Sequence, residues 1–247
     1  MAKLTQSYVH GGSITPLIGD TIGVHFDKAA ERWNERDALI VRQQRISWSY
    51  GELKAKVDAF AAGLLALGLA PGDRVGIWSP NNAEWVITQL ATAKAGLILV
   101  NINPAYRLSE LDYALNKVGC KALVTADSFK TSDYVGMLRE LAPEIDRCAP
   151  SKLQAKRLPA LTTLIRIGEG EKRGFLRFDA CLLYTSGDPD VVGVSLWRDD
   201  GRAIELVPAD ARRVAGDLLF WRRGAASACC RADVLSSGIH QVPSGAP

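Results

Sequence analysis

The sequence of 247 residues lacks long apolar runs and has only two methionines and five cysteines. Its longest strongly apolar stretch is 12 residues, at positions 59–70, and it contains two glycines. A membrane-spanning helix needs about 20 apolar residues, so we expect no transmembrane segment. The first residues also lack the apolar centre of a signal peptide. Five cysteines without regular spacing form no disulfide framework, which favours a reducing, cytoplasmic location.

An excess of charge of one sign is also missing. Lysine and arginine total 30 against 27 aspartate and glutamate, which leaves a net charge of +3. This small excess, with no Lys/Arg run, argues against a nucleic acid or an anionic membrane as partner. A hydrophobic content of 47% excludes wholesale disorder, and the length allows one or two domains.

The common phosphate-binding motifs are absent. No G-x-G-x-x-G follows a predicted strand, and there is no G-x-x-x-x-G-K-[ST] loop. The residues after the predicted strand 74–78 read Ser-Pro-Asn-Asn, and residues 168–170, Gly-Glu-Gly, are typical of a polar turn. These patterns assign no catalytic residue.

Metal-ligand spacing is absent as well. The three histidines lie far apart, none at ligand spacing from Cys, Asp or Glu, and His25 is predicted to be a surface residue; the other two are His10 and His240. Cys120 is predicted to be a small buried residue, and the adjacent Cys229 and Cys230 have no metal partners. We therefore predict no metal ligand.

Residues 20–180 show alternating helix and strand patterns. An apolar stripe of 3.6-residue period after Asp20 predicts a first helix, capped by that side chain. Two short strands are predicted at 39–41 and 46–48. Ser49 and Glu52 then form a capping box that starts a second helix with one apolar face.

Four further strands are predicted at 74–78, 97–100, 122–125 and 163–167. Helices separate them, the first capped by Asn81 or Asn82. The strand at 97–100 is continuously apolar, which is typical of a parallel strand covered on both faces. This order predicts an α/β fold with a partial doubly wound parallel sheet flanked by helices. The tryptophans at 33, 48, 78 and 85 follow the periodicity of a core.

The composition changes near residue 180. All eleven lysines precede it, whereas residues 181–247 hold seven arginines and no lysine. Only weak patterns follow: a strand at 205–207, a helix from Ala209 and an apolar stretch at 218–221. We predict a domain at 1–180 and an atypical tail at 181–247. The tail is disordered or read in a shifted frame, or its composition differs by chance.

Longer motifs in the first two thirds of the chain resemble a known family. The pieces are Ile-Ser-Trp-Ser-Tyr-Gly-Glu-Leu at 46–53, Pro-Gly-Asp-Arg-Val-Gly-Ile-Trp at 71–78, Asn-Asn-Ala-Glu-Trp-Val at 81–86, and residues 93–107 followed by 109–116. In this order they resemble the adenylate-forming (AMP-binding) superfamily, in particular its fatty-acyl-CoA synthetases, which are long- or medium-chain ligases. The resemblance extends from about residue 8 to 178.

The resemblance implies a chemistry for the longer family. Such enzymes join a fatty acid to the α-phosphate of ATP with Mg²⁺, release pyrophosphate, and transfer the acyl group to coenzyme A. The matching residues Asn103, Pro104, Tyr106 and Arg107 are interpreted as turn and packing positions, with Arg107 also a candidate to approach a ligand.

The family's phosphate loop is only partly present. It reads Thr-Ser-Gly-Thr-Thr-Gly-x-Pro-Lys-Gly, and this chain matches its start at Thr185, Ser186 and Gly187. Asp188 follows, where a carboxylate repels phosphate. We interpret Thr185–Gly187 as a possible remnant of the ATP loop. The C-terminal lid with its catalytic lysine is also absent, so we predict an N-terminal fragment that is inactive by itself.

Two alternatives remain open at this stage. One is a non-catalytic α/β module that binds a partner. The other is a Rossmann-like nucleotide-dependent oxidoreductase or transferase, which the missing glycine-rich first turn disfavours.

Overall fold

The computed structural model describes residues 17–183, 194–197 and 203–206. Its centre is a five-stranded sheet in the order β4-β3-β5-β8-β9, in which all neighbours pair in parallel. The strands are β3 (Arg74–Trp78), β4 (Ile98–Asn101), β5 (Ala122–Ala126), β8 (Thr163–Ile167) and β9 (Leu176–Arg177). The predicted α/β class with a partial doubly wound parallel sheet is confirmed.

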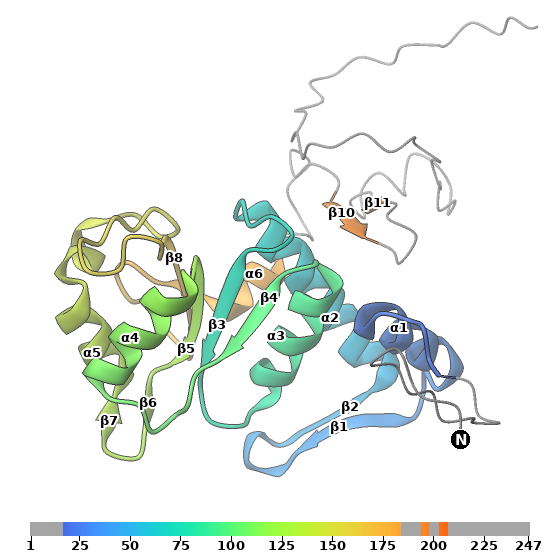
Figure 1. The fold of residues 1–247 in the computed structure, drawn as a ribbon. Coiled ribbons are helices and arrows are strands. Elements are labelled where there is room, and N and C mark those ends of the chain that lie inside the picture. Colours follow the sequence, from blue (N-terminus) through green and yellow to red (C-terminus); the bar gives the residue numbers. More distant parts are fainter. Residues whose placement is uncertain (1–16, 184–193, 198–202, 207–247) are drawn as a thin grey trace, which may run out of the picture.

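Helices connect the strands and cover both faces of the sheet (Figure 1). α3 (Ala83–Lys94) joins β3 to β4, and α4 (Leu108–Val118) joins β4 to β5. α5 (Tyr134–Leu141) and a short 3₁₀ helix, η2 (Pro143–Arg147), lie between β5 and β8. The helices α4 and α5 lie on one side of the sheet, and α2 (Tyr50–Ala66) and α3 lie on the other (Figure 1).

Alternating side chains of the sheet enter two separate cores. On the α2 and α3 face, Val75, Val124 and Ile165 pack with the apolar face of α2. On the opposite face, Leu123 and Leu164 pack with α4 and α5. The predicted core tryptophans differ in burial, because Trp78 is fully buried whereas the other three are half-buried: Trp33, Trp48 and Trp85.

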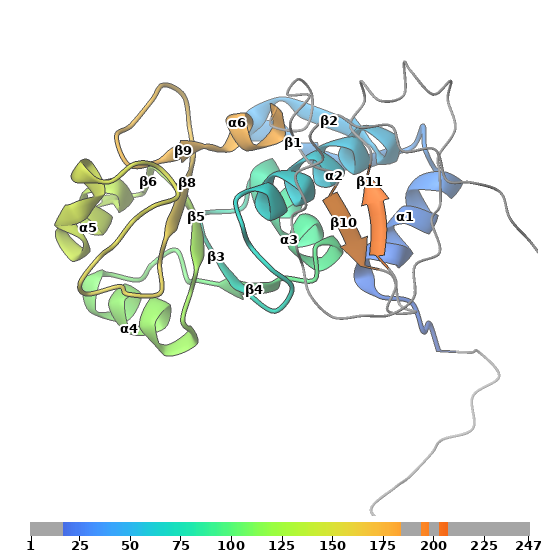
Figure 2. The same ribbon diagram turned by 90° about the horizontal axis from the view of Figure 1, so that it is seen from above.

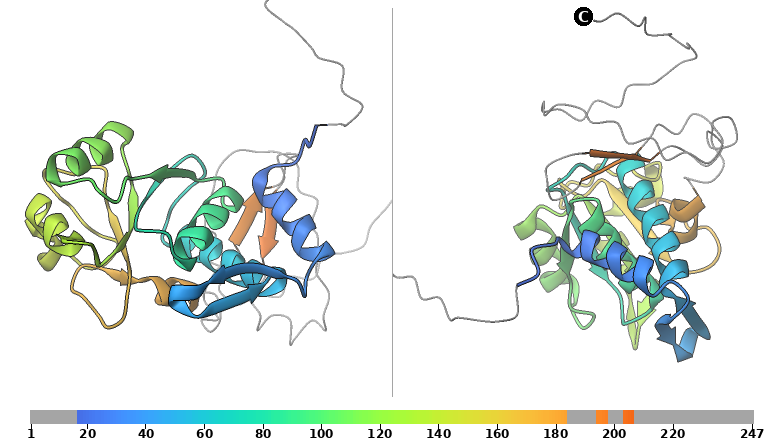
Figure 3. Two further views of the ribbon diagram at one scale, coloured as in Figure 1. Left: turned by 90° about the horizontal axis from the view of Figure 1, so that it is seen from below. Right: turned by 90° about the vertical axis from the view of Figure 1, so that its right-hand side faces the viewer.

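The N-terminal part lies against α2 and α3. α1 (Ile22–Arg32) packs on both helices, and Figure 3 shows it lying alongside them. An antiparallel hairpin of β1 (Asp37–Val41) and β2 (Ile46–Ser49), closed by η1 (Arg42–Gln44), packs against α2. The capping box is formed: Ser49 Oγ accepts from Glu52 N at 3.2 Å, and Glu52 accepts from Ser49 N at 2.8 Å.

The last described elements return to α2. α6 (Phe178–Leu183) follows β9 and stacks Phe178 on Phe60, with ring centroids 4.2 Å apart. A second hairpin, β10 (Val194–Trp197) with β11 (Ala203–Leu206), contacts α2 (Figure 2). The strand predicted at 205–207 is therefore found at 203–206. The helix from Ala209 and the stretch at 218–221 lie outside the described residues.

Two sequence predictions are wrong in detail. Thr21 caps α1, its side chain accepting from Val24 N, while Asp20 pairs with Lys28 at 2.5 Å. The strand predicted to be covered on both faces is β4, and it lies at the edge of the sheet with Ile98 48% exposed. An apolar run reports hydrophobicity and not position in a sheet, so it did not distinguish an edge strand from a central one.

Within the described residues no helix is long and apolar enough to cross a bilayer.

Candidate functional site

The loops at the carboxyl edge of the parallel sheet form the candidate site. The connection from β3 leads through α3 to β4 on one side, whereas β5 leads through α5 to β8 on the other. The direction of the connections thus reverses between β3 and β5. In open α/β sheets, ligands bind outside the carboxyl ends of the strands at such a reversal. Ser79 lies at this point and is 2% exposed; its hydroxyl donates to Pro80 O and accepts from Asn82 Nδ2, both at 2.9 Å.

An aromatic pair fixes the loop that follows β4. Trp78 and Tyr134 stack with ring centroids 3.6 Å apart, and both are fully buried. Trp78 Nε1 donates to Asn103 O at 3.2 Å, and Tyr134 Oη donates to Pro104 O at 2.5 Å. Burial raises the pKa of Tyr134 to about 12, which keeps this hydroxyl protonated as a donor. Both aromatic rings therefore hold the Asn103–Pro104 turn through its carbonyl oxygens.

The same turn presents Arg107. Asn103 Oδ1 accepts from Ala105 N at 2.9 Å, an Asx turn, and Arg107 is the residue before α4. Glu110 accepts from Arg107 N at 3.1 Å. The Arg107 side chain is exposed, and its Nη2 donates to Thr131 Oγ1 at 3.5 Å. The predicted turn and packing role is confirmed for Asn103 and Pro104, and Arg107 lies at the carboxyl edge, where it was a candidate to meet a ligand.

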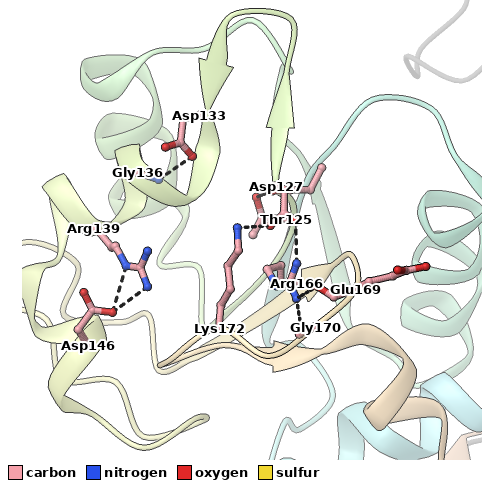
Figure 4. Close-up of polar contacts among 11 residues, drawn as sticks. Thr125, Asp127, Asp133, Gly136, Arg139, Asp146, Arg166, Glu169, Gly170 and Lys172 are labelled. Carbon is pink, nitrogen blue, oxygen red and sulfur yellow. Dashed lines mark hydrogen bonds and ion pairs between the residues drawn. The ribbon is translucent and has the colours of Figure 1, made fainter.

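A buried arginine ties two other loops together. Arg166 lies within β8 and is 0% exposed. Its Nη1 donates to Asp127 Oδ2 at 2.8 Å, and its Nη2 donates to the carbonyl oxygens of Glu169, at 2.7 Å, and Gly170. Lys172 Nζ lies 3.1 Å from Asp127 Oδ1 (Figure 4). Asp127 thus sits between two cations and joins the loop after β5 to the loop after β8.

The Asp127–Arg166–Lys172 cluster positions backbone and has little capacity to bind a ligand. Both terminal nitrogens of the guanidinium are occupied by protein oxygens, and Nε is buried without a partner. The carbonyls that it holds belong to the predicted polar turn at 168–170, where Gly168 has φ 150° and Gly170 has φ 70°. The cluster therefore fixes the segment that leads into β9 and α6.

The candidate phosphate-loop residues Thr185, Ser186 and Gly187 lie outside the described residues, as does Asp188. α6 ends at Leu183, two residues before Thr185. α6 is fixed to α2 at Gly63, where a Cβ would overlap the carbonyl oxygen of Cys181. The structure thus places the helix that precedes the candidate loop, and the loop stays a prediction.

The other predicted residues are accounted for as follows. His25 is exposed and lies 3.6 Å from Asp20, and Cys120 is buried, as predicted. The remaining histidines and the Cys229–Cys230 pair lie outside the described residues. Among the described side chains no group of three or more His, Cys, Asp or Glu could hold a metal ion.

The Asp127–Arg166–Lys172 cluster is not among the residues predicted from the sequence. Its one signal is a charged residue inside an otherwise apolar strand, Thr-Leu-Ile-Arg-Ile at 163–167. A buried arginine requires a partner, but its partner, Asp127, lies 39 residues away in sequence. The periodicity that identified the strand contained no information about that partner.

Residues 26–187 match the AMP-binding enzyme family, and this range includes every loop of the candidate site. The chain belongs to the AMP-binding enzyme family. It is 48% identical over 161 residues to the mitochondrial medium-chain acyl-CoA ligase of Pongo abelii, covering 65% of this chain and 26% of that protein. A putative acyl-CoA synthetase of Bacillus subtilis is 36% identical over 163 residues. The chain spans about a quarter of the length of the first of these relatives.

Solved structures of the family share this fold. An acetoacetyl-CoA synthetase from Streptomyces lividans has a TM-score of 0.55 at 27% identity, over 66% of this chain and 25% of that one. A long-chain-fatty-acid-CoA ligase from Archaeoglobus fulgidus has a TM-score of 0.56 at 20% identity, over 83% of this chain and 35% of that one. The match to the AMP-binding family disfavours both alternatives, the binding module and the Rossmann-like enzyme.

Proposed function

We propose that this chain is the N-terminal α/β part of a fatty-acyl-CoA ligase. The longer enzyme joins a fatty carboxylate to AMP with release of pyrophosphate and then transfers the acyl group to the coenzyme A thiolate. The observation that carries the proposal is 48% identity over 161 residues to a protein named as a medium-chain acyl-CoA ligase. We therefore propose a medium-chain fatty acid as the substrate.

In this proposal the described residues hold the loops of the candidate site in position. The Asp127–Arg166–Lys172 cluster and the aromatic pair Trp78–Tyr134 hold the loops at the carboxyl edge. α6 then carries the chain to Thr185, Ser186 and Gly187, which we propose to be a partial phosphate loop for ATP. Mg²⁺ and coenzyme A are assigned to the longer enzyme, and no step is assigned to them here.

We propose that the 247-residue chain is inactive by itself. Adenylation needs cationic groups and backbone donors around the triphosphate, and the loss of a single preorganised donor costs about 10²–10³ in rate. The chain matches only the first part of the loop and places Asp188 beside it. Fatty-acid-dependent ATP–pyrophosphate exchange with octanoate or laurate, ATP and Mg²⁺ should equal the no-protein control; exchange above it would contradict the proposal.

A replacement experiment tests the family function itself. Residues 20–180 of this chain replace the matching segment of the human medium-chain acyl-CoA ligase, which is 47% identical over 161 residues. If the segment is a ligase segment, the chimera forms octanoyl-CoA. A chimera that folds with the stability of its parent but forms no product would contradict the proposal.

The location in the cell is also part of the proposal. The described thiols are free, at Cys120, Cys148 and Cys181, which fits a reducing compartment. We propose the cytoplasm, whereas several relatives carry a mitochondrial name. Fractionation of the source cells with an antibody to this chain distinguishes the two.

A further inference from the structure

We propose that the outer surface of α4, with the neighbouring edge of β4, is a contact between two copies of this chain. The inference is independent of the proposed activity. It rests on a groove, on the exposure of the side chains that line it, and on the order of charges along α4.

The groove follows from the position of β4 in the sheet. Among the described strands β4 is hydrogen-bonded only to β3, so no described strand pairs with its other edge, and Ile98 is 48% exposed. Next to it lies an open groove of about 440 Å³ between the end of β4 and α4. Its lining includes Val100 and Ile102 from the strand side and Tyr106 and Tyr113 from the helix side. An edge strand of this kind accepts further contacts readily.

The helix side of the groove is a surface suited to a protein. Tyr113 is 67% exposed, and its ring combines a large apolar surface with a hydroxyl that hydrogen-bonds, which suits a contact with another protein surface. Ser109, Glu110, Ala114 and Lys117 line the same groove. They recur at helical spacing, so they form one face of α4, opposite to the buried Leu111 and Leu115.

The order of charges on this face of α4 is complementary to itself, so a second copy of the chain can bind there. Glu110 lies two helical turns before Lys117, and Tyr113 and Ala114 lie midway between them. When two α4 helices meet antiparallel about a two-fold axis at their midpoint, Glu110 of each copy faces Lys117 of the other. Ala114 permits close approach there, and each Tyr113 enters the groove of the other copy. A two-fold interface requires self-complementarity of this kind.

The test is the mass of the full 247-residue chain in solution, measured by light scattering over a range of protein concentrations. We expect about twice 26.7 kDa. Tyr113→Arg should give the single-chain mass, because it places a charge at the axis. Ile40→Arg is the matched control: Ile40 is also exposed, at 60%, but it lies on β1, and its variant should keep the double mass.

A charge exchange separates this interface from other associations. Lys117→Glu places like charges opposite Glu110 and should weaken the dimer about tenfold or more. Adding Glu110→Lys should restore it, with circular dichroism confirming that α4 persists without the Glu110 bond to Arg107 N. A single-chain mass for the wild type would overturn the proposal. A dimer or larger aggregate that Tyr113→Arg leaves intact, or a double variant that does not recover, would also overturn it.

Discussion

Arg166 connects two loops at the carboxyl edge of the sheet. It is fully buried, yet its guanidinium meets one carboxylate and two carbonyl oxygens from two different loops. A buried charge is tolerated only when it is paired and hydrogen-bonded, so the loops and the arginine depend on each other. Lys172 adds a second cation, but its side chain is 38% exposed and water screens the pair.

Replacing Arg166 with methionine should therefore destabilise the chain strongly. The variant leaves the Glu169 and Gly170 carbonyls without their donor and removes one of the two cations that flank Asp127. We expect a loss of about 2–4 kcal/mol in the free energy of unfolding, measured by urea denaturation. Lys172→Met is the control and should cost less than about 1 kcal/mol. Equal losses for the two variants would contradict the assignment.

Gly63→Ala should destabilise the chain although alanine is the better helix former. In an open helix this change stabilises by about 1 kcal/mol. At Gly63 the added Cβ overlaps the carbonyl oxygen of Cys181, so α6 must shift away from α2. We expect a net loss of about 1–3 kcal/mol in urea denaturation. A gain in stability would show that α6 does not pack at this position.

The described cysteines should differ in reactivity. Burial raises the pKa of Cys120 to about 12, and burial together with a smaller effect of Asp179 raises the pKa of Cys181 to about 12. At pH 8 only about one thiol in 10⁴ is then ionised. Iodoacetamide should label the half-buried Cys148 first, and raising the pH should accelerate labelling of the other two. Peptide mass spectrometry measures the order, and early labelling of Cys120 in the native chain would contradict it.

At the scale of elements, local patterns predicted the helices well. The capping box at Ser49 and the apolar faces of α2 and α5 depend on neighbours within a few residues, so the sequence contains the whole signal. Strand order depends on distant segments. The run at 97–100 therefore predicted a strand correctly but not its place at the edge, and the pairing of Arg166 with Asp127 was not predicted.

The boundary near residue 180 remains a prediction. Residues 20–180 contain capped helices and buried strands, whereas the sequence after 180 has only weak periodicity. Limited proteolysis of the 247-residue chain should leave a resistant fragment that ends near residue 180, identified by mass spectrometry. A protease-resistant species of full length would contradict the predicted boundary near residue 180.

At the scale of the whole molecule, the sequence was enough to predict the family. It predicted the residues of the candidate site only in part. The motifs at 71–86 and 93–116 resemble the AMP-binding enzyme family, and the match of residues 26–187 to that family confirms the resemblance. The candidate residues Thr185–Gly187 lie outside the described residues, so their role in binding phosphate stays a prediction.

The origin of the tail is testable at the level of the gene. If residues after 180 are read in a shifted frame, another frame of the coding DNA should encode Thr-Ser-Gly-Thr-Thr-Gly-x-Pro-Lys-Gly or a close variant. Sequencing the DNA around codon 180 and translating all three frames decides this. If every frame lacks the loop, the tail is a fusion or a deletion product.

The rate of octanoyl-CoA formation by the chimera tests the central claim most directly. With residues 20–180 in place of the matching human segment, we expect a kcat/KM for octanoate within about tenfold of the parent, a difference of about 1.4 kcal/mol in the barrier. The same chimera with Arg166→Met should have a lower free energy of unfolding than the chimera without this substitution. A chimera as stable as the parent, with no octanoyl-CoA formed, would contradict the claim that this chain is part of a fatty-acyl-CoA ligase.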